Sequence, residues 1–126
     1  MSERPLIAIV DDDEILLQLA ENALQSYGFA TVCFRGGPDF LAAMESLPNI
    51  RLIVCDMQMP EMTGYELQCR LEELGAGIPM IFLSATVDMP LASAMIKNGA
   101  VDILCKPLDV PALLRLINSV ITSEAA

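Results

Sequence analysis

Five short apolar runs, spaced regularly along the chain, constrain its fold most strongly. They occupy residues 6–10, 30–34, 52–55, 79–84 and 101–105. The runs are nearly continuous in apolar character, as expected of strands that are buried on both faces of a parallel sheet. The stretches between them carry apolar residues every three or four positions, which is typical of helices. This alternation predicts an α/β fold, a doubly wound five-stranded parallel sheet with helices on both faces.

The stretches between the runs also contain helix start and stop signals. Thr63 and Glu66 fit a capping box, in which each side chain satisfies an unpaired amide at the helix start. Asp88 and Asp109 are predicted to cap the last two helices, and Gly28 is predicted to end the first. That first helix is predicted to bury one apolar face, made of Ile15, Leu16, Leu19, Ala20, Ala23, Leu24 and Tyr27.

Length and composition limit the class of protein. A chain of 126 residues forms one domain, so we expect residues 1–126 to be a single unit with its core at about 6–121. No apolar run approaches the roughly 18 residues of a membrane span, and the N-terminus lacks the pattern of a signal peptide. We therefore expect a cytoplasmic protein that does not contact a membrane.

Charge and the scarce residue types exclude several functions. A net charge of −10 argues against direct nucleic-acid contact, which requires clustered Lys and Arg, but suits divalent cations and basic protein partners. The chain has no histidine, so histidine catalysis and histidine metal ligands are excluded. The four cysteines, Cys33, Cys55, Cys69 and Cys105, lack metal-site spacing and are interpreted as buried apolar residues.

Polar residues follow four of the five predicted strands. Asp11 and Asp12 come after the first, Asp56 after the third, Ser84 closes the fourth and Lys106 follows the fifth. Sites in open parallel sheets form at the carboxyl ends of the strands. If the first and third strands are neighbours, three carboxylates converge there, with a hydroxyl and an ammonium facing them.

Such a group has a specific chemical use. Oxygen ligands without His or Cys suit Mg²⁺ or Mn²⁺. A metal ion and the Lys106 ammonium on either side of Asp56 would neutralise a phosphoryl group while that carboxylate attacks phosphorus, forming an acyl phosphate. Each residue also has a structural alternative: helix-dipole complementation by residues 11–14, a turn at Asp56, a cap at Ser84 and a solvated Lys106. Their joint occurrence at strand ends favours the functional interpretation.

With these residues in place, the chain resembles the receiver domain of two-component response regulators over about residues 6–121. The matching pieces are Ile9-Val10-Asp11-Asp12-Asp13, Asp56-Met57-Gln58-Met59-Pro60-Glu61-Met62-Thr63-Gly64, Phe82-Leu83-Ser84-Ala85, Gly99-Ala100-Val101-Asp102 and Lys106-Pro107. The resemblance implies a flavodoxin-like receiver fold with strand order 2-1-3-4-5.

The resemblance also implies a role for each site residue. Asp56 would accept a phosphoryl group from a phosphohistidine on a sensor histidine kinase or a histidine phosphotransfer protein. Asp12, Asp56 and the backbone carbonyl of Gln58 would bind Mg²⁺ directly, and Asp11 would act mainly through coordinated water. Lys106 would pair with Asp56, and Ser84 would move to the phosphoryl oxygen. The Lys106-Pro107 peptide bond is expected to be cis.

The family's switch aromatic is replaced here by Ile103, so rotation of an aromatic ring cannot be the readout. We expect a dimer or effector contact through the predicted helix 88–97, the strand 101–105 and the last helix. Leu91, Met95 and Ile96 are candidates for that surface, with Ile103 on the adjoining strand. The alternative is that most of these residues belong to the core.

Two other functions fit the same sheet. An aspartyl phosphatase that uses Mg²⁺ usually has a second acid two residues after the nucleophile, where this chain has Gln58. A receiver-like interaction module that is not phosphorylated would keep the fold alone, and the complete set of acids, hydroxyl and lysine argues against it.

Overall fold

Five parallel strands form one sheet in the order β2-β1-β3-β4-β5, which confirms the predicted topology. The computed structural model describes residues 4–47, 49–86 and 88–125. The strands are β1 (Leu6–Val10), β2 (Ala30–Phe34), β3 (Ile50–Asp56), β4 (Met80–Ser84) and β5 (Asp102–Cys105). The helices are α1 (Glu14–Ser26), α2 (Gly37–Ala43), α3 (Gly64–Glu73), α4 (Met89–Lys97) and α5 (Val110–Ala125), and a 3-10 turn, η1 (Met44–Ser46), follows α2.

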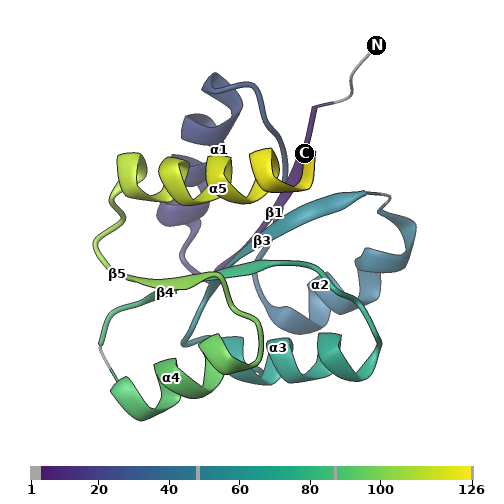
Figure 1. Ribbon diagram of the computed structural model, residues 1–126, viewed down its shortest axis with the longest axis vertical. Helices are drawn as coiled ribbons and strands as arrows, with labels where there is room; N and C mark the ends of the chain where they lie inside the picture. The colour runs from purple at the N-terminus through teal and green to yellow at the C-terminus, as the bar shows by residue number, and fades with distance from the viewer. Residues whose placement is uncertain (1–3, 48, 87, 126) are drawn as a thin grey trace.

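The helices cover both faces of the sheet. Figure 1 shows α1 and α5 on one face and α2, α3 and α4 on the other. Successive side chains of a strand point to opposite faces of the sheet. Ile7 and Ile9 of β1 therefore pack in the core under α1 and α5, while Ala8 and Val10 pack in the core under α2, α3 and α4. The continuous apolar runs are therefore needed to fill two separate cores.

Strand register brings the carboxyl ends of the strands to one edge. Val10 pairs with Cys55, Asp56 with Leu83, and Ser84 with Cys105. The residues that follow these positions lie side by side, although they are up to about a hundred positions apart in sequence. The sheet thus gathers the polar residues that the sequence placed at strand ends.

The predicted helix caps are confirmed. The Thr63 hydroxyl accepts from Glu66 N at 3.1 Å, and the Glu66 carboxylate accepts from Thr63 N at 2.9 Å. Asp88 accepts from Leu91 N at 3.0 Å, and Asp109 accepts from Ala112 N at 3.1 Å. These bonds satisfy amides that have no partner within the helix.

The predicted buried face of α1 is partly wrong. Ile15 is 80% exposed, Leu19 is 50% exposed and Tyr27 is 65% exposed. The residues that α1 buries are Leu16, Leu17, Ala20 and Leu24. At 3.6 residues per turn, Leu17 lies roughly opposite Ile15 and Leu19 on the helix. The side of α1 that packs on the sheet is therefore centred nearer to Leu17 than the predicted apolar face was.

The cysteine prediction holds for one residue only. Cys55 is buried in β3, whereas Cys33 and Cys69 are half-buried and Cys105 is exposed on the edge strand β5. Burial, together with the nearby Glu21 carboxylate, raises the pKa of the Cys33 thiol to about 12. In the described part of the chain, none of the helices has the length and hydropathy needed to cross a lipid bilayer.

Candidate functional site

Three carboxylates converge at the carboxyl edge of the sheet, as the sequence predicted. Asp11 follows β1 and Asp56 ends β3, and both side chains are buried, while Asp12 is exposed beside them. One oxygen from each carboxylate lies within 4.8 Å of the oxygens of the other two. The adjacency of β1 and β3, which the resemblance implied, is what brings them together.

Lys106, the residue directly after β5, completes this cluster. Its Nζ lies 3.2 Å from Asp56 Oδ1 and 3.4 Å from Asp11 Oδ2, and its side chain is 23% exposed. The backbone N–H of Lys106 donates to Ser84 O at 2.7 Å, which ties the end of β5 to the end of β4. The Lys106-Pro107 peptide bond is cis, as expected.

Local backbone amides orient the two buried carboxylates. Asp11 Oδ1 accepts from Asp13 N at 2.8 Å, and Asp56 Oδ1 accepts from Gln58 N at 3.3 Å. Asp13 in turn caps α1 by accepting from the amides of Ile15 and Leu16. The start of α1 and the loop after β3 therefore fix the direction of both acids.

Burial dominates the acidity of these acids. It raises the pKa of Asp11 to about 6, against the lowering effects of the Asp13 amide and Lys106, while Asp56 raises it further. Burial likewise raises the pKa of Asp56, which Lys106 and the Gln58 amide lower. Burial lowers the pKa of Lys106, but Asp11 and Asp56 outweigh it and the net pKa is raised. The cluster therefore favours a bound positive charge.

The Ser84 hydroxyl bonds to the backbone of the loop after β4 in this structure. Its Oγ donates to Thr86 O at 2.5 Å and accepts from Thr86 N at 3.3 Å. Ser84 is buried at the end of β4, so the loop that follows holds its hydroxyl. The sequence did not reveal this partner, because a backbone carbonyl carries no sequence signal.

Two further features of the site were missed. Arg35, at the end of β2, forms an ion pair of 2.6 Å with Glu14 at the start of α1. Gly64 begins α3, and a Cβ at that position would lie 2.6 Å from Asp56 O and 3.1 Å from the Phe82 ring. Gly64 thus lets α3 pack directly against the strand end that carries Asp56, and only tertiary packing reveals that need.

The donor set fits a hard divalent cation. Among the described residues, Asp11 Oδ2 is buried without a hydrogen-bond partner, since its contact with Lys106 has the geometry of an ion pair only. All three side chains offer carboxylate oxygens, the ligands that Mg²⁺ and Mn²⁺ prefer. Gln58 lies in the loop two residues after Asp56, where its N–H faces that carboxylate.

An apolar cavity of about 490 Å³ lies beside Ser84, between β5 and α4. Ile103 and Leu91 line it and are half-buried. Of the residues predicted for a partner surface, Met95 is buried in the core, whereas Ile96 is 44% exposed, and Met89 is also exposed. Met95 therefore belongs to the core, as the alternative interpretation had it, whereas Ile96 lies at the surface.

Comparison with known proteins agrees with this geometry. Residues 7–118 match the family described as the response regulator receiver domain. The chain is 38% identical over 117 residues to the response regulator protein TmoT of Ectopseudomonas mendocina, covering 93% of this chain and 53% of that protein. It is 32% identical over 120 residues to the tetrathionate response regulatory protein TtrR of Salmonella typhimurium, covering 95% and 58%.

Solved structures show the same fold. A response regulator receiver protein from Pseudomonas putida has a TM-score of 0.89 and 27% identity, covering 94% of this chain and 99% of that one. The chain spans just over half the length of the two curated relatives above. The match over most of its length shows that this chain belongs to the receiver domains of two-component response regulators.

Proposed function

We propose that Asp56 accepts a phosphoryl group from a phosphohistidine of a sensor histidine kinase or a histidine phosphotransfer protein. The main support is the position of Asp56: its carboxylate is buried, Lys106 Nζ lies 3.2 Å away, and oxygens of two further acids lie within 4.8 Å. In the reaction a carboxylate oxygen bonds to phosphorus while the bond from phosphorus to the imidazole nitrogen breaks. The product is an aspartyl phosphate.

Lys106 and Ser84 serve the phosphoryl group in this proposal. Lys106 already contacts Asp56 and offers a fixed positive charge to the developing phosphoryl oxygens. Ser84 would release Thr86 O and donate to a phosphoryl oxygen instead, which would move the loop between β4 and α4. That movement is the conformational signal.

The same site would hold Mg²⁺, or Mn²⁺, through Asp11, Asp12, Asp56 and the backbone carbonyl of Gln58. When bound, the ion supplies positive charge that screens the attacking carboxylate and the phosphoryl oxygens from each other. The buried carboxylate of Asp11 supports this assignment: its pKa is raised, and its Oδ2 has the Lys106 ammonium at 3.4 Å but no hydrogen-bond donor among the described residues.

The signal would pass to a partner through α4, β5 and α5. Exposed Ile96 and half-buried Leu91 and Ile103 supply apolar area there, where a dimer partner or an output domain can dock. The net charge of −10 favours a protein partner over direct nucleic-acid contact. This role belongs in the cytoplasm, where ATP supplies the kinase.

Intact mass after incubation with acetyl phosphate tests the proposal. We expect one added phosphoryl group on the wild type in the presence of Mg²⁺, and none when EDTA replaces the metal. Asp56→Asn should show no adduct. Asp109→Asn is the matched control, because Asn caps a helix as well as Asp does and Asp109 lies outside the cluster.

Beryllofluoride, a stable phosphoryl mimic, guards against rapid hydrolysis of the adduct. We expect it to shift the amide resonances of Ser84 and Thr86 in the wild type and not in Asp56→Asn. If neither reagent changes the wild type, the chain is an interaction module that is not phosphorylated, and the proposal fails. Turnover of an external phosphate ester would instead indicate a phosphatase, against which Gln58 argues.

A further inference from the structure

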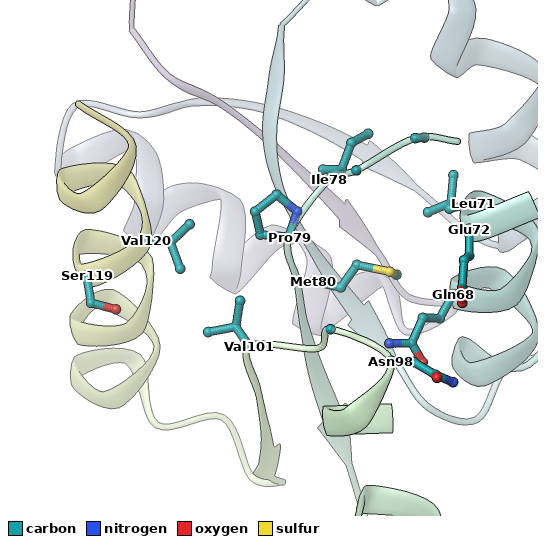
Figure 2. Close-up of a pocket in the computed structure, with 13 residues that line it drawn as sticks. Gln68, Leu71, Glu72, Ile78, Pro79, Met80, Asn98, Val101, Ser119 and Val120 are labelled. Atoms are coloured by element: carbon teal, nitrogen blue, oxygen red, sulfur yellow. The ribbon is translucent and has the colours of Figure 1, made fainter. Parts of the chain in front are cut away.

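A cavity of about 660 Å³ lies at the other end of the sheet from the acidic cluster. It is bounded by α3, the segment that enters β4, the turn between α4 and β5, and the C-terminal half of α5 (Figure 2). Pro79, Met80, Val101 and Val120 give it an apolar lining. Cavities of this size accommodate small-molecule ligands. Nothing in the proposed phosphoryl chemistry uses it.

Gln68 brings a buried amide to this cavity. The side chain is 6% exposed, and its Nε2 donates to Met95 O at 3.0 Å. Met95 O also accepts from Ala100 N, so both its acceptor positions are used by the protein. Among the described residues, Gln68 Oε1 has no hydrogen-bond partner. A buried acceptor without a donor is unfavourable, and a donor that arrives with a ligand removes that deficit.

The acceptor lies in the wall of the cavity. Figure 2 shows the Gln68 side chain extending from α3 towards the part of the cavity that Asn98 and Met80 line. Oε1 itself has almost no accessible surface, so a ligand reaches it only when the Gln68 amide turns, which also moves Nε2 relative to Met95 O. The terminal torsion of a glutamine is soft, so a small rotation exposes the oxygen to the cavity.

The charge of the lining selects the kind of ligand. Glu72 is the one ionisable side chain among the described lining residues, and Asn98 and Ser119 are its neutral polar companions. An anion would meet repulsion from Glu72, whereas a cation with N–H donors would meet the Glu72 carboxylate and the neutral acceptors of Gln68, Asn98 and Ser119. We propose that this cavity binds a small amphipathic cation, an aromatic amine or amidine whose ring covers Met80 and Val101 and whose N–H groups reach Gln68 Oε1.

Benzamidine is the probe, and amide chemical shifts of the full chain are the measurement. We expect saturable shifts at Asn98, Gly99 and Val101 and at the Gln68 side-chain amide, with no comparable change at Gln58 or Ser84. Benzoate has the same ring with the opposite charge, and we expect it to bind at least tenfold more weakly. Shifts centred on Asp11 and Asp12 would place the probe on the acidic cluster and overturn the proposal.

Two variants locate the binding site. Ser119→Phe places a ring at the exposed rim of the cavity and should weaken benzamidine binding at least tenfold. Ser26→Phe is the matched control, because each serine is exposed on a helix and donates to the carbonyl three residues earlier at 2.8 Å. Gln68→Met removes the acceptor and should weaken binding about fivefold.

If Gln68→Met does not fold, Ser119→Phe decides alone. Equal affinity in wild type and Ser119→Phe, or equal affinity for benzamidine and benzoate, would overturn the proposal. The assay needs neither phosphodonor nor metal, so its result is independent of whether Asp56 is phosphorylated.

Discussion

Asp11 is a buried acid whose pKa is raised to about 6, mainly by burial. A raised native pKa means that the native state binds the proton more tightly than the unfolded state, whose value is near 3.8. The stability that Asp11 contributes is therefore present below about pH 4 and is lost as pH rises through about 6.

Replacing Asp11 by Asn should remove this loss. In EDTA, we expect the stability of Asp11→Asn relative to wild type to increase by about 1 kcal/mol between roughly pH 5 and pH 7.5. Urea unfolding at the two pH values measures it. Asp39→Asn removes one exposed carboxylate and serves as the control. A relative stability that does not change with pH would contradict the role of burial.

Gly64 is the position where one added methyl group does most harm near the site. Its Cβ would lie 2.6 Å from Asp56 O, a backbone atom that cannot easily move. We expect Gly64→Ala to destabilise the fold by about 1–3 kcal/mol. At Gly77 a Cβ would meet nothing within 4 Å, so Gly77→Ala should be neutral or slightly stabilising. Thermal unfolding compares them, and equal midpoints would disprove the close packing.

At the scale of the element, α1 shows which side of a helix meets the sheet. Leu17 is 7% exposed and packs in the core with β1, while Leu19 is half exposed. Leu17→Ala should cost about 2–5 kcal/mol, because it leaves a cavity. Leu19→Ala should cost less than about 1 kcal/mol. Urea unfolding of the two variants measures the difference. A larger loss of stability in Leu19→Ala than in Leu17→Ala would mean that the helix buries the face predicted from the sequence, which contains Leu19.

The capping box of α3 explains why the helix begins so close to the site. Thr63 and Glu66 satisfy each other's backbone amides, and Gly64 follows at once. The capping box holds Thr63 at the start of α3, so the C-terminal end of the loop that follows Asp56 is held in place. Asp56, which belongs to the acidic cluster, and Thr63, which caps the helix, therefore lie in one short segment.

At the scale of the whole molecule, we expect the acidic cluster to couple cation binding to folding. The cluster of Asp11, Asp12 and Asp56 exists only in the folded chain, so a cation that it binds stabilises the fold. At Mg²⁺ tenfold above its dissociation constant we expect a gain of about 1.4 kcal/mol. Urea unfolding measures it.

Ionic strength is the control for this metal effect, because the chain carries a net charge of −10. Sodium chloride of matched ionic strength screens that charge but should give a smaller gain than Mg²⁺. Asp12→Asn should reduce the Mg²⁺ gain while leaving the response to sodium chloride intact. An equal gain from both salts would mean that the cluster has no specific cation.

The sequence by itself determined the elements and the residues of the site. Apolar runs located the five strands, of which β1, β3 and β4 are mostly buried, and caps such as Thr63 and Asp88 located helix starts through local bonds. The polar residues at strand ends, Asp11, Asp56 and Lys106, were recognisable because each breaks an apolar run. Each of these signals lies within a few consecutive residues, so it can be recognised from the amino-acid sequence without the structure.

The tertiary structure decided what depends on contacts between distant residues. Strand order put Asp11 beside Asp56, and packing chose Leu17 over Leu19 as the buried side chain of α1. It also turned Ser84 to the Thr86 carbonyl and left Gln68 Oε1 without a donor. Hydrogen bonds to backbone atoms and the side of a helix that meets the sheet are set by three-dimensional packing, which no local pattern encodes.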